Sequence, residues 1–162
     1  MNISDLRTLY VTELQEARSM EELLAEAMPQ LAEVATDPQL KDMLREDVDE
    51  VRSQVERLAQ IIDSHGAEPY EHRDNSMATI CAEAEKWAGM IDDAAVRDAA
   101  IIASAQRVQH YEIAVYGSLA TWAKQLGLDE LDTLVAILDE EKGADDKLTE
   151  IAKGTVNPGA PT

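Results

Sequence analysis

The feature that most constrains the fold is a long helical periodicity around residues 94–127. No Pro or Gly interrupts its first 23 residues, 94–116. At 3.6 residues per turn, one stripe of this segment contains Ile102, Gln106, Gln109, Ile113, Tyr116 and Ala120. Glu112 lies at the edge of the same stripe. Because a buried carboxylate is costly unless it is paired, protonated or bound to a cation, the segment predicts a buried helix that needs a reason for its acid.

Similar periodicity recurs along the chain and predicts an all-α protein with four long helices and a shorter one. No alternating β-branched run bounded by turn residues predicts a strand. Pro29 predicts a kink or a local break, and Asp37 with Pro38 predicts a helix start. The loop at 66–76 and the helix after it predict a crossover between two helical hairpins. The expected helices are residues 4–35, 38–64, 77–91, 95–125 and 129–153.

Length and composition predict one folded domain over residues 1–153. The chain has 162 residues, of which 45% are apolar, enough for a real core. It has no Phe and only 4% aromatic residues, so the core is expected to consist of Leu, Ile, Val, Ala and Met. Residues 154–162, GTVNPGAPT, have the composition of a disordered tail.

The charge balance is strongly acidic, with 33 acids against 14 bases and a formal net charge of −19. Nucleic acids and anionic membranes require a cationic face, so neither is expected as a partner, whereas cations are. Most of these acids are expected to form a solvated surface that aids solubility. Cys81 is the single cysteine, which excludes an intramolecular disulfide. The absence of a charged-then-apolar leader and of a long apolar run predicts a cytoplasmic location.

Acids recur at or beside the apolar stripe in the middle of all four long helices. Four helices packed as a bundle would bring these positions into one layer, where like charges and burial raise each other's pKa values. Divalent ions solve this problem, and oxygen ligands suit iron, manganese or magnesium. The alternative is that the acids point into solvent or pair with nearby bases, namely Arg18, Arg52, Arg57, Arg107 or Lys142. The candidate residues are Glu21, Asp47, Glu50, Gln109, Glu112, Glu141 and Asp145.

Several segments closely resemble the YciF/YciE family of ferritin-like proteins. The most specific is VRDAAIIASAQRVQHYEIAVYGSLATWAKQLG at residues 96–127, and LDEEKGADDKLTEIA at residues 138–152 resembles the end of the family's last helix. Residues 5–36 resemble its first helix, and QVERLAQII at residues 54–62 resembles part of its second. The resemblance covers nearly the whole chain.

The resemblance implies a ferritin-like four-helix bundle with a long crossover that carries a short fifth helix. It also implies a bacterial stress-associated protein, usually dimeric, with a di-iron site and an unsettled biochemical activity. Carried over by position, the matching acids are Glu21, Glu50, Glu112, Glu141 and Asp145.

Two candidate ligand positions, and one position beside a ligand, depart from the family's pattern. Asp47 stands where the family has His, and Gln109 stands where it has the first Glu of E-H-Y-E. Val51 also replaces the Thr that follows the acid of the second helix. An Asp can bind a hard cation, whereas Gln109 offers only a neutral carbonyl oxygen. His110 is expected to be a helix-packing or surface residue and not a ligand, so the candidate set has no imidazole. One of two metal sites is therefore expected to be weakened or lost.

Two functions follow as competing hypotheses, and the sequence does not decide whether the protein is an enzyme. In the first, the core holds one or two iron or manganese ions that react with dioxygen or peroxide, with Tyr116 or Tyr111 as a redox neighbour. In the second, the metal site is degenerate and the protein is a structural or interaction dimer. Iron storage in a closed shell has no support in the sequence. The expected partners are metal ions and a second copy of the chain.

Overall fold

The computed structural model describes residues 3–161, and its regular elements in this range are all helical. Four long helices and the crossover helix α3 confirm the predicted all-α bundle. A π-helical turn, η1, and the three-residue helix α6 follow the last long helix. The elements are α1 (Leu6–Val34), α2 (Pro38–Ser64), α3 (Asn75–Met90), α4 (Ala94–Leu126), α5 (Leu131–Ile151), η1 (Ala152–Val156) and α6 (Asn157–Gly159).

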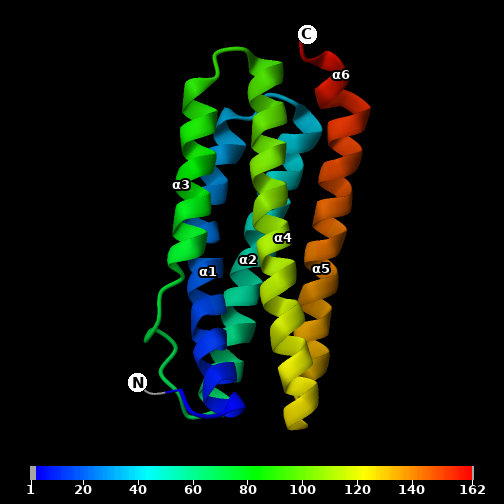
Figure 1. Ribbon diagram of the computed structural model, residues 1–162. Coiled ribbons are helices and arrows are strands. Elements are labelled where there is room, and N and C mark those ends of the chain that lie inside the picture. Colours follow the sequence, from blue (N-terminus) through cyan, green and yellow to red (C-terminus); the bar gives the residue numbers. More distant parts are fainter. Residues whose placement is uncertain (1–2, 162) are drawn as a thin grey trace.

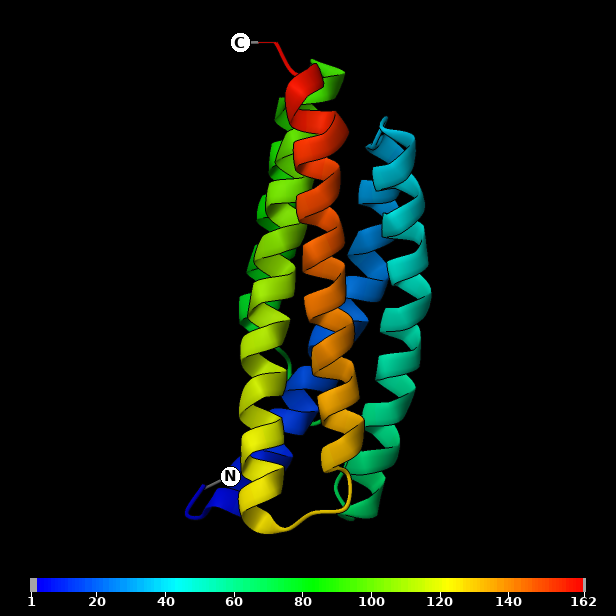
Figure 2. The same cartoon turned by 90° about the vertical axis from the view of Figure 1, so that its right-hand side faces the viewer.

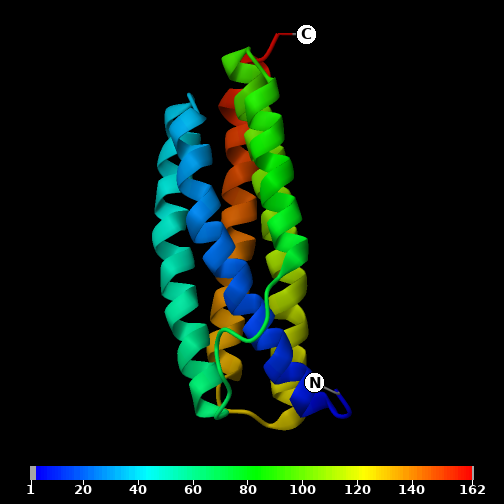
Figure 3. The same cartoon turned by 90° about the vertical axis from the view of Figure 1, so that its left-hand side faces the viewer.

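The helices form two antiparallel hairpins, α1 with α2 and α4 with α5, which lie against each other (Figure 1). The loop after α2 climbs along the lower half of the bundle, and α3 covers the upper half beside α1 and α4 (Figure 3). Seen from the opposite side, α5 lies between α4 and α2 (Figure 2). The loop and α3 together therefore make the long crossover that the sequence predicts.

Side-chain caps explain why these helices begin where they do. Asp5, Asp37, Asp74 and Asp93 each accept a hydrogen bond from a backbone N–H in the first turn of the following helix. Gly127 ends α4 in the left-handed conformation, with φ 65°. The helix α1 continues through Pro29, as a single helix over residues 4–35 requires, so of the predicted kink or break the break does not occur. The Pro29 ring removes one backbone donor, and the helical turns on both sides keep theirs.

The core consists almost entirely of aliphatic side chains and Met, as the composition predicts. Tyr10 and Tyr116 are its only fully buried aromatic residues among residues 3–161. The candidate Asp47 lies on the buried face of α2, whereas the buried stripe of α4 is rotated slightly from the one that the sequence predicts. Glu112 consequently lies inside the buried face of α4, and Ala144 takes the place expected for Asp145 on α5.

A buried acid at the upper end ties the two hairpins together. Asp98 of α4 is 3% exposed and accepts hydrogen bonds from the turn between α1 and α2. Its oxygens receive the Thr36 N–H at 2.9 Å, the Thr36 hydroxyl at 2.6 Å and the Asp37 N–H at 2.7 Å. The buried Asp98 carboxylate thus has three donors from the other hairpin, so it is a structural residue.

A second polar cluster closes the lower end of the bundle. Glu130, in the turn before α5, accepts the Tyr10 hydroxyl at 2.9 Å and lies 2.6 Å from His65 Nε2. The Tyr10 and His65 rings meet edge to face, with centroids 5.6 Å apart. The cluster links α1, the end of α2 and the start of α5.

The C-terminal residues differ from the expected disordered tail. The chain continues from α5 through η1 and α6, and the Val156 side chain is 4% exposed. The apolar contact of this residue with the core explains why the segment keeps a helical course. Among the described residues, no helix is long and apolar enough to cross a membrane.

Candidate metal centre

One acid from each long helix lies in a buried layer at mid-bundle. Glu21 of α1 and Glu112 of α4 have no exposed surface, Glu141 of α5 is 3% exposed and Asp47 of α2 is 6% exposed. All four are among the candidate residues predicted from the sequence. The alternative that they pair with bases does not hold for them, because none forms an ion pair with any residue in 3–161.

The pKa values of the four acids reflect both burial and each other's charge. Burial and the Glu141 charge raise the pKa of Glu21 and of Glu112 well above the usual range. Burial, followed by the Asp47 charge, raises the pKa of Glu141 to about 8. Burial, followed by the Glu50 charge, raises the pKa of Asp47 to about 7. The four acids therefore form a single electrostatic cluster, in which the charge of one acid affects the pKa values of others.

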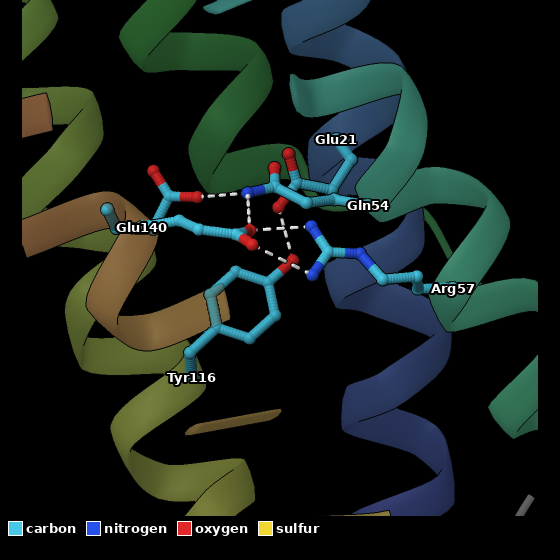
Figure 4. A network of polar contacts seen from close by, with 6 residues as sticks. Glu21, Gln54, Arg57, Tyr116 and Glu140 are labelled. Carbon is cyan, nitrogen blue, oxygen red and sulfur yellow. Dashed lines mark hydrogen bonds and ion pairs between the residues drawn. The ribbon is translucent and has the colours of Figure 1, made fainter. Parts of the chain in front are cut away.

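Neutral donors hold two of these acids in place. The Tyr116 hydroxyl donates to Glu21 Oε1, and burial raises the pKa of Tyr116, so it keeps its proton (Figure 4). Gln54 Nε2 donates to Glu141 Oε1. With the Gln109 amide oriented to satisfy both groups, its nitrogen donates to Glu141 Oε2 at 2.7 Å and to the Glu141 carbonyl at 3.1 Å. Gln109 thus orients an acid and directs its amide nitrogen, not its oxygen, at the cluster.

The network extends from Glu141 to the surface between α2 and α5. Gln54 Nε2 also lies 3.3 Å from Glu140 Oε2, and Arg57 pairs with both Glu140 oxygens at 3.1 and 2.5 Å (Figure 4). Arg57 was predicted as a possible base for the candidate acids, whereas Glu140, its partner in the structure, was not among the candidates. Glu140 directly precedes Glu141 in the sequence. A residue next to a buried position lies nearer the surface of the helix, and this spacing could have indicated that Glu140 pairs with a base there.

Glu112 has the least satisfied side chain of the layer. Neither of its carboxyl oxygens accepts a hydrogen bond from a donor within the described chain, and Glu21 Oε2 is in the same condition. The carboxyl groups of Glu112 and Glu21 lie within hydrogen-bonding reach of each other. Two carboxyl groups can bond only when one is protonated, so the pair requires either a proton or a cation.

Two candidate acids lie outside this layer. Glu50 is exposed on α2, one turn beyond Asp47. Asp145 is partly exposed, accepts a hydrogen bond from Gln106 at 3.2 Å and lies 3.5 Å from His110 Nε2. The His110 side chain is 68% exposed, at the surface as expected. The structure therefore brings together four of the six candidate acids, with Gln109 beside Glu141.

The arrangement is not a preformed metal site. Across residues 3–161, no three His, Cys, Asp or Glu side chains are grouped in a way that could hold a metal ion as they stand. The layer nevertheless has the chemistry that a hard cation requires, because its oxygens outnumber its donors and lie away from water. It can either share protons among its carboxyl groups or exchange them for a cation.

Comparisons with known proteins match nearly the whole chain. The family described as Domain of unknown function (DUF892) matches residues 5–160. Protein YciF of Escherichia coli (strain K12) is 35% identical over 162 residues, which are 99% of this chain and 98% of YciF. The crystal structure of the E. coli stress protein YciF matches with a TM-score of 0.89 and 34% identity, over 96% of this chain and 99% of that one. The structure of YcfI from Rhodopseudomonas palustris matches with a TM-score of 0.88 and 37% identity, over 91% and 95% of the two chains.

Proposed function

Because this chain belongs to the DUF892 family and resembles the stress protein YciF throughout its length, we propose that it is a stress-associated protein that binds a divalent metal in its bundle core. The observation that carries the proposal is Glu112, whose side chain is fully buried with neither oxygen partnered in the described chain. An orphaned buried carboxylate beside a second one is unstable without a proton or a cation. A bound cation removes this instability at neutral pH.

The donor set supports one hard ion, iron or manganese. Glu21, Glu112 and Glu141 would hold it from three helices, and Asp47 would complete the set from the fourth. Carboxylates without an imidazole favour hard oxygen-seeking cations over zinc or copper. Because Glu50 and Asp145 lie away from the layer, the residues fit one ion better than the two of a di-iron pair.

Ferrous ion in such a site would supply reducing electrons to dioxygen or peroxide. The residues of the chain would hold and orient the ligands: Gln54 and Gln109 fix Glu141, and Tyr116 fixes Glu21. The aliphatic core around the layer would exclude bulk water. This arrangement supports oxidase or peroxidase assays once binding is established.

Elemental analysis and thermal unfolding test this function directly. The protein is purified without affinity nickel, then dialysed against ferrous or manganous ion under exclusion of air. We expect about one equivalent of metal per chain and a rise in the melting temperature, since an ion at about 100 times its Kd stabilises the fold by about 2.7 kcal/mol. Glu112→Gln is expected to abolish both effects, and Asp98→Asn, at the other buried acid of α4, is expected to retain them. An unchanged melting temperature with no retained metal would refute the proposal.

A metal-free structural or interaction dimer is the alternative function. It is favoured by the absence of a preformed group of three ligands among residues 3–161 and by Gln109, which donates to Glu141. The relative YcfI is described only as a candidate structural protein. Light scattering at micromolar concentration measures the predicted homodimer, which both functions accommodate. Metal retention therefore decides between the two functions.

A further inference from the structure

A surface pocket of about 740 Å³ lies between α3 and α4, two helices that run side by side (Figure 1). Small-molecule pockets in proteins usually measure about 300–1,000 Å³, so this one has the volume of a ligand site. Its residues recur at helical spacing on both helices, which places two stripes opposite each other. On α4 they are Ser104, Arg107 and Tyr111, and on α3 they include Ile80, Glu83 and Trp87.

Apolar and aromatic side chains form much of the wall of this α3–α4 pocket. Trp87 is 42% exposed, in a chain with only 4% aromatic residues. Ile80 packs against the core and also lines the pocket. The Tyr111 hydroxyl donates to Asp74 Oδ2 at 2.9 Å, so its proton is already used and its ring is the part available to a ligand. Such a wall can bury an apolar body, and an aromatic ring also gains from stacking on Trp87.

Arg107 is a base without an acidic partner in a chain that has 33 acids and 14 bases. No carboxylate among residues 3–161 forms an ion pair with its guanidinium group. The one hydrogen bond of its side chain within this range is long, from Nη1 to Ser104 Oγ at 3.5 Å. The guanidinium group is therefore free to donate two N–H groups to the carboxylate of a ligand.

Ser104 adds a buried donor beside Arg107. Its side chain is 2% exposed, and its hydroxyl donates to no acceptor within the described part of the chain. Ser118 and Thr121, on the same helix, instead donate to the carbonyl four residues earlier. A buried hydroxyl normally uses its proton, so the Ser104 hydroxyl lacks an acceptor that a ligand in the pocket can supply.

The charges around the pocket leave room for an anion. Glu83 is the one acid among the described residues that line it, and the Lys86 ammonium group pairs with this acid at 2.5 Å. Lys86 also lies 5.6 Å from the centroid of the Trp87 ring, so a second positive charge stands beside the apolar wall. The pocket is thus more favourable to an anion than the acidic chain as a whole.

We propose that the α3–α4 pocket binds a small aromatic carboxylate. The carboxylate group pairs with Arg107 and accepts a hydrogen bond from the Ser104 hydroxyl, while the ring packs against Trp87 and Ile80. No residue that lines the pocket belongs to the buried layer, so binding there does not depend on the proposed metal site.

Calorimetric titration of the full chain with cinnamate tests this site, with cinnamyl alcohol as the matched uncharged ligand. We expect one equivalent of cinnamate per chain, bound about tenfold more tightly than the alcohol. Arg107→Gln is expected to weaken cinnamate binding about tenfold and to leave the alcohol unchanged, because only the acid uses the guanidinium group. Trp87→Leu is expected to weaken both ligands about fivefold. The control Arg45→Gln, at an exposed base of α2 outside the pocket, should change neither.

Three outcomes would overturn the site: no saturable binding of cinnamate by the wild type, equal binding of the acid and the alcohol, or an Arg107→Gln variant that binds cinnamate as well as the wild type does. Octanoate tests the aromatic assignment, and binding as tight as that of cinnamate would overturn it. Repeating the titration at chain concentrations below and above dimer formation, measured by light scattering, tests the competing occupant. Cinnamate binding that disappears in the dimer would overturn the proposal, because a second copy of the chain would then cover the pocket.

Discussion

Asp98 and Glu112 are two buried acids on the same helix with opposite surroundings. Asp98 accepts three hydrogen bonds from the α1–α2 turn, whereas neither oxygen of Glu112 has a donor in the described chain. Both side chains are almost completely buried, at 3% and 0% exposure. Burial alone therefore does not distinguish a structural acid from a binding acid, and the supply of donors does.

The largest expected effect is the pH dependence of the metal-free protein. The pKa values of Asp47 and Glu141 rise from 3.8 and 4.5 to about 7 and about 8, mainly through burial. The native state therefore holds protons that the unfolded chain has lost, and stability falls as pH rises from about 4 to about 8. The expected slope is about 1.4 kcal/mol per pH unit for each extra proton held.

Urea unfolding at pH 5, 6, 7 and 8 in the presence of a chelator measures this slope. Saturating Mn²⁺ should flatten or reverse it, because metal binding requires the ionised carboxylates. If the unfolding free energy of the metal-free protein stays constant or rises over this pH range, the acids of the layer are stabilised as carboxylates, as Asp98 is. That result would contradict the distinction between the two kinds of buried acid.

The next largest effect is expected from Asp98→Asn. The new amide nitrogen faces donors in the α1–α2 turn, so at least one partly buried N–H or O–H loses its acceptor, and the buried amide nitrogen lacks one. We expect a loss of about 2–4 kcal/mol in the free energy of unfolding. Thermal and urea denaturation at pH 7 measure it, and a loss below about 0.5 kcal/mol would mean that the turn finds other acceptors.

The smallest of the three expected effects on stability is that of Glu112→Gln. This variant makes the same change from acid to amide, but at a buried acid that has no donor. Removing one acid from the cluster relieves charge repulsion, and the amide can donate to Glu21 Oε2. We expect the metal-free protein to gain about 1–2 kcal/mol at pH 7.5, opposite in sign to Asp98→Asn. Opposite signs of the change in unfolding free energy for the two variants would support the distinction between Asp98 and Glu112. A Glu112→Gln variant that is less stable than the wild type would contradict it.

Most of the fold was predictable because periodicity and capping act locally. The helix from Pro38 to Ser64 was predicted with both ends correct, and Asp37 with Pro38 marks its start. Of the kink or local break predicted at Pro29, the break does not occur, and the helical course of the segment after Lys153 was not predicted. Both depend on packing against other helices, which composition does not describe.

The candidate layer was predicted less completely, because periodicity leaves the rotation of a helix uncertain by about one residue. One residue corresponds to about 100° around the helix axis. Asp145 was predicted at the layer but lies outside it, because the buried position is Ala144, one residue earlier. Glu50 was placed beside the stripe for the same reason and faces outward. The hydrogen bonds of Asp98 join residues about 60 positions apart in the chain, and no local pattern could indicate them.

The division of the buried layer between two hairpins has a further consequence. Glu21 and Asp47 belong to the α1–α2 hairpin, and Glu112 and Glu141 belong to the α4–α5 hairpin. Half of the layer therefore lies on each side of the crossover, and neither half holds more than two of its carboxylates. In a chain cleaved in that crossover, the layer of four carboxylates would be complete only when the two fragments reassemble. A cation that needs ligands from both hairpins would bind only when the two hairpins are associated. Occupancy of the site would therefore report whether the whole bundle is assembled.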